Sequence, residues 1–447
     1  MGYCKFVWGP AFDLQWHRHA LSKCERVRDM AKLVIEGKHK LSGAVNIHGA
    51  KNSALPVLAA TLLAKGTSEI HNCPMLSDVA ASVRILRHLG CNVTRSGDCV
   101  TVDSLGLNRS DIPDTLMREM RSSIVFLGAI AARTGEAHMS FPGGCELGTR
   151  PIDLHLSALR QLGMEILEEG GRLECSVKGR LRGTTIALAF PSVGATENII
   201  LASVTAEGTT SILNAAREPE IVDLCNYLNK CGARISGAGE SAITIEGVDS
   251  LYGCSHSVIP DRIETVTYMA AAAITGSTLT LKNVNTGHIA TVLPVFREAG
   301  CTIASSGGEL KISAPNRLNR IHTIRTMPYP GFPTDAQAPV MAMMSVADGT
   351  SVFIENIFES RYKHAGELIR LGAKIKIEGR VAIVEGVKRL YGSEVVSTDL
   401  RGGAALVIAG LAAEGITEVT QIHHIDRGYE KIEENLRGIG AVIKRVD

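Results

Sequence analysis

An internal repeat is the feature of this 447-residue chain that most restricts its fold. An apolar helical stretch, a glycine and a Thr/Ser-rich strand follow one another six times, and the spacings between these glycines are 69, 73, 68, 73 and 66 residues. A second phrase closes each unit, with an amphipathic stretch that ends in Leu-Gly or a similar pair before a short strand. Both sets fit a glycine that follows a helix. The glycines are Gly66, Gly135, Gly208, Gly276, Gly349 and Gly415 in the first set and Gly90, Gly163, Gly232, Gly300, Gly372 and Gly440 in the second.

Each unit predicts the order strand, helix, strand, helix, strand. The first helix is apolar nearly all round, as in residues 402–413, and a helix without a polar face is buried. The second is amphipathic, as in residues 79–89, where Val79, Val83 and Leu86 form one stripe. We therefore expect an α/β protein in which six units form two globular halves of three, with the first helices inside.

Composition excludes several classes of protein. The 47 basic and 46 acidic residues give a net charge of +1, so neither nucleic acid nor an anionic membrane is expected as a partner. Eleven cysteines without a CxxC pair argue against a disulfide framework and a structural zinc site, and favour a reducing cytoplasm. No apolar run reaches the length of about 18–20 residues that spans a bilayer. Residues 1–29 lie outside the repeats, and we expect them to be a disordered extension.

The second unit carries an insertion. The distance from first to second glycine is 24, 28, 24, 24, 23 and 25 residues, and the extra residues fall in the glycine-rich loop 141–153. A loop added to a rigid scaffold is a common place for function. There Cys145 could act as a proton donor or nucleophile, or be an inert thiol of the core. Arg150 offers a guanidinium fork for a phosphate.

Charged residues gather where the buried helices begin. Helix N-termini present unpaired N–H groups and the positive end of a dipole, which favour anions, and Lys51, Arg121 and Arg401 would add positive charge. If the halves face each other through these ends, the cleft between them would bind phosphate and carboxylate groups. Alternatively, Lys51 and Arg121 pair with Asp335 and Asp399, or these residues merely cap helices.

Another polar pair tempts a metal interpretation. His423-His424 has no suitably spaced carboxylate or histidine nearby, so we expect a strand here and no metal site.

Several separated motifs together resemble the bacterial UDP-N-acetylglucosamine enolpyruvyl transferases, from about Met30 to the C-terminus. The resemblance implies two inside-out α/β barrel domains of three repeats each, between which the chain crosses twice. It divides the chain into an extension (1–29), a discontinuous domain (30–51 plus 260–447) and an inserted domain (52–259) that carries loop 141–153. The motifs are Gly49–Asn52, Pro142–Cys145, Arg150–Leu154, Ala216–Asp223, Phe332–Asp335, Thr398–Arg401 and Asp426–Glu430.

The reaction that this family implies is the first committed step of peptidoglycan synthesis. Phosphoenolpyruvate and UDP-N-acetylglucosamine would give an enolpyruvyl ether at the sugar 3′-hydroxyl plus phosphate, by addition and then elimination. The resemblance implies a cytoplasmic transferase without cofactor, metal, nucleic acid or membrane partner, and leaves the oligomeric state unspecified. Two alternatives are a 3-phosphoshikimate enolpyruvyl transferase and a non-catalytic nucleotide-sugar sensor on the same scaffold.

The resemblance also implies roles for individual residues. Cys145 would be the general acid at C3 of phosphoenolpyruvate and the target of fosfomycin, Asp335 the base for the sugar hydroxyl, and Asp399 an aid to proton transfer, with Lys51 and Arg427 also catalytic. The phosphoenolpyruvate site would consist of Lys51, Asn52, Arg121, Arg150, Arg401 and Arg427. The nucleotide-sugar site would consist of Asn52, Arg121, Arg150, Pro151, Ile152, Asp153, Leu154, Ser192, Val193, Gly194, Asp335 and Ile357.

Overall fold

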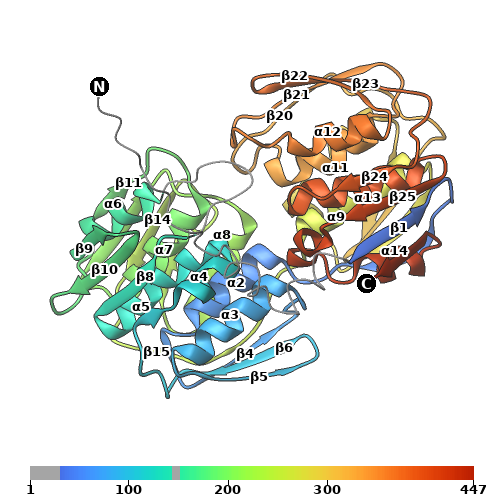
Figure 1. The fold of residues 1–447 in the computed structure, drawn as a ribbon. Coiled ribbons are helices and arrows are strands. Elements are labelled where there is room, and N and C mark those ends of the chain that lie inside the picture. The colour runs from blue at the N-terminus through green and yellow to red at the C-terminus, as the bar shows by residue number, and fades with distance from the viewer. Residues whose placement is uncertain (1–30, 143–151) are drawn as a thin grey trace, which may run out of the picture.

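The computed structural model describes residues 31–142 and 152–447, which form two lobes (Figure 1). The buried core of one lobe draws on residues between Ala50 and Val258, and that of the other on residues 31–47 and 266–443. The blue N-terminal strand β1 (Lys32–Glu36) thus lies among the yellow-to-red elements of the second lobe (Figure 1). The predicted fold class is confirmed: each lobe is an α/β barrel built from three repeats.

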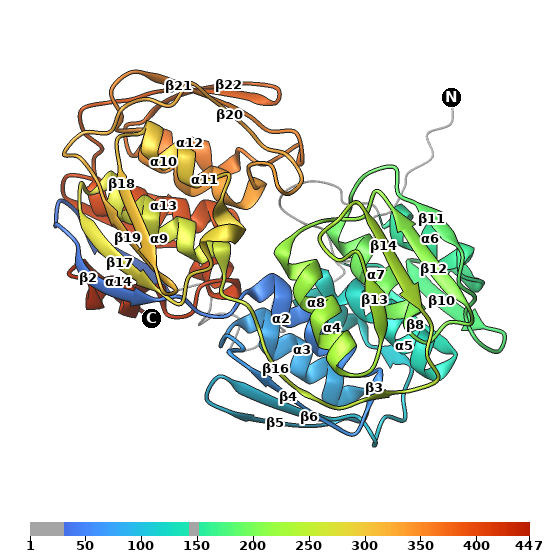
Figure 2. The same ribbon diagram turned by 180° about the vertical axis from the view of Figure 1, so that it is seen from behind.

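The lobes are inside-out because their sheets lie outside and their most apolar helices inside. The strands of the described residues form six four-stranded sheets and one two-stranded sheet. Three helices in each lobe are buried over nearly their whole length, and the sheets lie around them (Figures 1 and 2). They are α2 (Lys51–Ala60), α5 (Phe126–Thr134) and α7 (Val193–Ser203) in the first lobe and α9 (Arg262–Ile274), α11 (Thr334–Met344) and α13 (Leu400–Ala412) in the second.

Each repeat unit contains four strands, one more than the three that the sequence predicts. A strand, a buried helix, a parallel strand and an amphipathic helix are followed by two strands that form a hairpin. In the second unit, β10 (Arg172–Val177) pairs antiparallel with both β8 (Glu136–Ser140) and β9 (Met164–Glu169). With β7 (Asp111–Ile112) this gives the sheet order β7-β8-β10-β9. The hairpin turn at Gly170-Gly171 is short, so the two strands read as one in the sequence.

The first lobe contains the following further elements. The first unit has β4 (Thr67–His71), α3 (Ser77–His88), β5 (Asn92–Ser96), β6 (Cys99–Asp103) and β16 (Ser255–Ser257). The second has β7 (Asp111–Ile112), α4 (Asp114–Glu119), η1 (Arg121–Val125), β8 (Glu136–Ser140), α6 (Asp153–Gln161), β9 (Met164–Glu169) and β10 (Arg172–Val177). The third has β11 (Thr185–Ala187), β12 (Thr209–Leu213), α8 (Pro219–Lys230), β13 (Arg234–Ser236) and β14 (Ala242–Glu246), and β3 (Ala64–Lys65) pairs with β15 (Leu251–Tyr252).

The second lobe repeats this pattern. The fourth unit has β2 (Ser42–Asn46), β17 (Thr278–Lys282), η2 (Thr286–Ile289), α10 (Leu293–Glu298), β18 (Thr302–Ser306) and β19 (Glu309–Ser313). The fifth has β20 (Thr323–Arg325), β21 (Thr350–Ile354), α12 (Lys363–Arg370), β22 (Lys374–Glu378) and β23 (Val381–Glu385). The sixth has β1 (Lys32–Glu36), β24 (Glu394–Val396), β25 (Ile416–Thr420), η3 (Ile422–Arg427), α14 (Ile432–Gly438) and β26 (Val442–Val446).

The two passages of the chain between the lobes lie side by side. Ala50 N donates to Ile259 O at 2.7 Å, and Asp261 N donates to His48 O at 2.9 Å. Strands far apart in sequence complete the sheets on either side, since β1 pairs with β25 and β26, and β16 pairs with β4. The division at 51/52 and 259/260 stays a prediction.

Helix patterning follows the sequence. In α3, Val79, Val83 and Leu86 are buried whereas Arg84 and Arg87 are exposed, as predicted. The expected strand at His423-His424 is wrong, because both residues lie in the 3-10 helix η3. The unit departs there from the regular pattern, with η3 and α14 in place of one helix.

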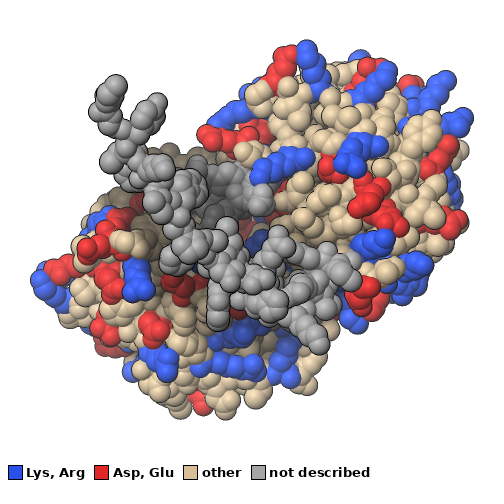
Figure 3. Space-filling model, viewed as in Figure 1, with Lys and Arg blue, Asp and Glu red and all other residues tan. Residues whose placement is uncertain are grey.

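Surface charge and helix hydropathy both bear on the partners expected from the sequence. On the face in Figure 3, acidic and basic side chains are mixed over both lobes, in line with the near-zero net charge. No helix among residues 31–142 and 152–447 is long and apolar enough to cross a membrane.

A side chain at the glycines that follow the second helices should destabilise the fold, because these glycines have positive φ. Gly440 follows α14 with φ of 98°, and an added Cβ would meet only Lys40 O at 3.4 Å, so strain rather than a clash opposes a side chain. We expect Gly440→Ala to lower the free energy of unfolding by about 1–2 kcal/mol. Gly438→Ala, two residues earlier within α14, should be neutral or stabilising by up to about 1 kcal/mol. Urea unfolding of both variants measures the difference, and equal effects would contradict it.

Candidate active site

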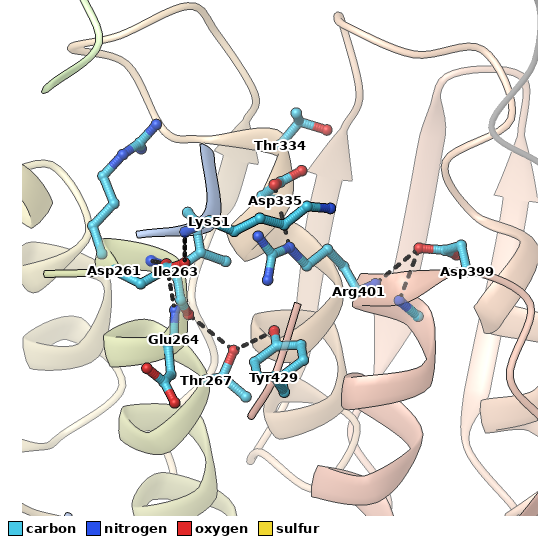
Figure 4. Close-up of polar contacts among 12 residues, drawn as sticks. Lys51, Asp261, Ile263, Glu264, Thr267, Thr334, Asp335, Asp399, Arg401 and Tyr429 are labelled. Carbon is cyan, nitrogen blue, oxygen red and sulfur yellow. Dashed lines mark hydrogen bonds and ion pairs between the residues drawn. The ribbon is translucent and has the colours of Figure 1, made fainter. Parts of the chain in front are cut away.

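Four of the buried helices, α2 of the first lobe and α9, α11 and α13 of the second, begin close together at the junction between the lobes (Figure 4). Asp261 caps α9 by accepting from Ile263 N at 2.7 Å and Glu264 N at 3.0 Å. Its other oxygen accepts from Lys51 N at 3.3 Å, at the first residue of α2. One carboxylate therefore holds the start of a first-lobe helix against the start of a second-lobe helix.

A buried carboxylate joins two of the predicted cations. Asp78 Oδ2 lies 2.7 Å from Lys51 Nζ, and Arg427 Nε donates to Asp78 Oδ1 at 3.0 Å. The side chain of Asp78 is 1% exposed and that of Lys51 is 9% exposed. Asp78 and Lys51 belong to the first lobe and Arg427 to the second, so this cluster is an ionic contact between lobes.

Burial and charge act on these groups in opposite directions. Burial lowers the pKa of Lys51 below its ordinary value, aided by Arg427 and Arg401, although Asp78 opposes this. Burial by itself disfavours ionised Asp78, but Lys51 and Arg427 outweigh it and lower the pKa of Asp78. Asp78 therefore favours the charged form of Lys51, against the effect of burial.

A second cluster lies at the starts of α11 and α13. Arg361 Nη2 donates to Asp335 Oδ1 at 2.9 Å, and Arg401 Nε donates to Asp335 Oδ2 at 3.2 Å. Asp399 caps α13 by accepting from Arg401 N and Gly402 N, both at 3.0 Å, and its Oδ1 lies 3.9 Å from Arg361 Nη1. The predicted residues Asp335, Asp399 and Arg401 are thus brought together.

Arg401 is a buried cation with an unused donor. Its side chain is 2% exposed, its guanidinium carbon lies 5.3 Å from the ring centre of Tyr429, and its Nη1 is buried without a hydrogen-bond partner among the described residues. Although burial disfavours the charge, Tyr429 and Asp335 raise the pKa of Arg401 above its ordinary value. A permanently charged donor of this kind can bind an anion without first leaving another partner.

Two segments predicted to contact a nucleotide sugar lie against each other in the first lobe. Ile152 precedes the first turn of α6, which holds Asp153 and Leu154, and Ser192 caps the start of α7 by accepting from Ala195 N at 3.3 Å. A Cβ added to Gly194 in the first turn of α7 would lie 2.9 Å from the ring of His155. Only a residue without a side chain fits this approach.

Some predicted residues are placed only in part. Cys145, Arg150 and Pro151 lie outside the described residues, as does the side chain of Arg121. Asn52 is half-buried at the second position of α2, and Ile357 follows β21 with its N–H donating to Glu355 Oε1 at 2.8 Å. The carboxylate of Glu355 thereby orders the loop that carries Ile357.

Sequence reasoning missed Asp78, Arg361 and Asp261. Asp78 lies at the start of an amphipathic helix, where an acidic residue ordinarily stabilises the helix through its favourable interaction with the helix dipole. A comparison of the second helices across the repeats, like that made for the first helices, would have placed Asp78 beside Asp153 and Glu220 as charged starts. Arg361 lies in a loop without such a signal.

No group of three or more His, Cys, Asp or Glu side chains within the described ranges could hold a metal ion.

Comparison with known proteins agrees with this architecture. The family model for EPSP synthase (3-phosphoshikimate 1-carboxyvinyltransferase) matches residues 35–436. A UDP-N-acetylglucosamine 1-carboxyvinyltransferase 2 of Caldanaerobacter subterraneus subsp. tengcongensis is 51% identical over 418 residues, covering 93% of this chain and 100% of that protein. A UDP-N-acetylglucosamine 1-carboxyvinyltransferase of Myxococcus xanthus is 48% identical over 419 residues, covering 93% and 99%.

Solved structures show the same fold. The enolpyruvyl transferase NikO from Streptomyces tendae has a TM-score of 0.85 at 26% identity, covering 93% of this chain and 99% of that one. EPSP synthase from Acinetobacter baumannii has a TM-score of 0.73 at 20% identity, which compares the fold alone, and covers 93% and 100%.

The class of protein that fold and site define is therefore the enolpyruvyl transferases. Within that class, the chain belongs to the family of the UDP-N-acetylglucosamine 1-carboxyvinyltransferases.

The Asp78 cluster predicts a stability effect that depends on pH. Asp78→Asn removes a buried charge from between two cations, so we expect the free energy of unfolding at pH 7 to fall by about 1–3 kcal/mol. Because the folded pKa of Asp78 is lowered, its contribution is present above the unfolded value of about 3.9 and is lost as pH falls through the folded value. The difference from the wild type should therefore narrow below about pH 4.

Urea unfolding between pH 7 and the acid limit measures this effect. Asp98→Asn, at an exposed position of the same lobe, is the control and should change stability by less than about 0.5 kcal/mol. A difference between Asp78→Asn and wild type that is independent of pH would contradict the assignment.

Proposed function

We propose that this protein transfers the enolpyruvyl group of phosphoenolpyruvate to the 3′-hydroxyl of UDP-N-acetylglucosamine, in the cytoplasm, as a step of peptidoglycan synthesis. The site assignment rests on one observation: buried cations from both lobes lie together at the starts of buried helices. One of them, Arg401, has its Nη1 unpaired among the described residues.

Phosphoenolpyruvate is placed where the helix starts meet. Its phosphate and carboxylate bind Lys51, Arg401 and Arg427, with Arg121 and Arg150 as further partners and Asn52 beside them. Asp78 already pairs with Lys51 and Arg427, so the substrate must compete with this carboxylate for them, whereas Nη1 of Arg401 has no hydrogen-bond partner among the described residues. The start of α11, which has no side-chain cap, adds N–H groups that favour the anion.

The chemistry proceeds by addition and then elimination. Asp335 accepts the proton of the sugar 3′-hydroxyl while the sugar oxygen forms a bond to C2 of phosphoenolpyruvate. At the same time the thiol of Cys145 gives a proton to C3. The resulting ketal then loses a proton from C3 as the bond from C2 to the phosphate oxygen breaks, with Asp399 assisting this proton transfer. Two charged groups on one carbon make nearby guanidinium and ammonium groups effective stabilisers of the ketal.

The nucleotide sugar is placed along the first lobe. The starts of α6 and α7 supply Ile152–Leu154 and Ser192–Gly194, and Arg150 and Pro151 precede them in the chain. Asp335 and Ile357 approach from the second lobe. Binding across both lobes favours their closure, which keeps water from the ketal.

Two other functions are distinguishable from this one. A 3-phosphoshikimate transferase shares the fold, but the relatives at about 50% identity carry the nucleotide-sugar name. A non-catalytic sensor would bind the nucleotide sugar without releasing phosphate.

Phosphate release tests the reaction and the role of Cys145 together. We expect release only with phosphoenolpyruvate and UDP-N-acetylglucosamine present, none with 3-phosphoshikimate, and a loss of at least about 100-fold in Cys145→Ser. Cys99→Ser, at a half-buried thiol elsewhere in the first lobe, should keep full activity. Fosfomycin should add one adduct per wild-type chain and none to Cys145→Ser, by intact mass. Release with 3-phosphoshikimate alone would favour the shikimate enzyme, and no release with either would favour the sensor.

The role of Asp335 predicts a separate kinetic signature. Asp335→Asn keeps the shape but removes the base, so kcat should fall by about 100- to 10,000-fold. Glu378→Gln, at an exposed carboxylate of β22 in the same lobe, is the matched control and should leave kcat unchanged. Steady-state kinetics of both variants, with circular dichroism to confirm folding, measures the effect; an active Asp335→Asn would remove Asp335 as the base.

A further inference from the structure

We propose that the second lobe carries a second anion site, at the end opposite the candidate active site, which binds a small multivalent phosphate anion. A cavity of about 170 Å³ lies there, with Lys38, Arg317, Lys388 and Arg389 among its lining residues. It lies where α9, α11 and α13 end, since Ile274, Val346 and Ala412 also line it. Nothing in the proposed reaction uses these residues.

The repeat brings these four cations together from three loops. Lys38 lies between β1 and β2, Arg317 between β19 and β20, and Lys388 and Arg389 between β23 and β24. Each loop joins the end of one unit to the start of the next. Because the three units of the lobe are arranged with pseudo-threefold symmetry, the three loops lie close together. All four residues are exposed, which leaves their charged ends available to a ligand from solvent.

Carboxylates neutralise only part of this charge. Glu414 lies 3.8 Å from Lys38 Nζ and 3.4 Å from Arg389 Nη1, and Asp348 lies 2.9 Å from Arg317 Nη2. Lys388 makes no hydrogen bond or ion pair with any described residue. Four cations against two carboxylates leave an excess that a multivalent anion would match.

The floor of the cavity is apolar. Leu318 is 2% exposed, Ile274 7% and Ala412 9%. An ionic group bound against such a floor is less screened by water than one on an open surface. The cavity volume of about 170 Å³ accommodates a small anion such as a free diphosphate.

Helix capping does not account for the four side chains. Backbone amides already satisfy carbonyls at these helix ends: Lys38 N donates to Leu411 O at 2.9 Å, Val387 N to Ser345 O at 2.8 Å and Ser277 N to Ala272 O at 2.9 Å. None of the four side chains donates to a helix carbonyl of the described chain. The dipoles of the helix ends favour nearby cations in a general way, and this is the alternative to test.

The same helices connect both ends of the lobe. α9, α11 and α13 contain 13, 11 and 13 residues, a length of about 16–20 Å at 1.5 Å per residue. Their starts carry Asp261, Asp335 and Asp399 of the candidate active site. A ligand at the far end would therefore contact the elements that position the site.

The test is a calorimetric titration of the full chain with inorganic pyrophosphate at low ionic strength. Lys388→Ala/Arg389→Ala should weaken one binding event at least tenfold. Lys374→Ala/Lys376→Ala removes the same charge from exposed positions of β22 and should bind as wild type does. ADP should bind no more tightly than pyrophosphate at this site.

Two outcomes would overturn the site. Identical isotherms for wild type and Lys388→Ala/Arg389→Ala would show that the cations only offset the helix dipoles. Tighter binding of ADP would show that the ligand is a nucleotide rather than a free phosphate anion. Phosphate release without pyrophosphate should be equal in all these variants, so failure of this site is separable from failure of the proposed function.

Discussion

The buried carboxylate of Asp78, held between Lys51 and Arg427, is the interaction on which the arrangement of the junction depends. It lies 2.7 Å from a cation of its own lobe and 3.0 Å from one of the other lobe. An isolated charge at 1% exposure would be strongly unfavourable, so each group requires the others. The same cations are the proposed partners of phosphoenolpyruvate, which links the contact between lobes to substrate binding.

This balance recurs across the junction. Asp335 pairs with Arg361 and Arg401, and Asp261 holds the start of α2 against α9. Apolar helices buried along their length leave only their starts for charged groups, so the fold itself concentrates ions where the lobes meet. If phosphoenolpyruvate binds as proposed, its competition with the protein carboxylates would give a physical reason for the lobes to change their contacts on binding.

Much of the fold could be predicted from the sequence, because the six repeats allow equivalent positions of one chain to be compared with one another. Buried helices such as α13 and amphipathic helices such as α3 lie where their patterns indicate. The hairpin in each unit was missed because a turn such as Gly170-Gly171 barely interrupts the strand pattern. In the site, Asp335, Asp399 and Arg401 were found as charged helix starts, whereas Asp78 was missed because an acidic residue at the start of an amphipathic helix ordinarily stabilises only that helix.

The most direct test is a double-mutant cycle on phosphoenolpyruvate binding with Lys51→Ala and Arg427→Ala. If both cations share Asp78 and the same anion, the double variant should lose clearly less affinity than the sum of the single variants. Strictly additive losses in binding free energy would show that the two residues act independently. That result would contradict a single anion site formed across the two lobes.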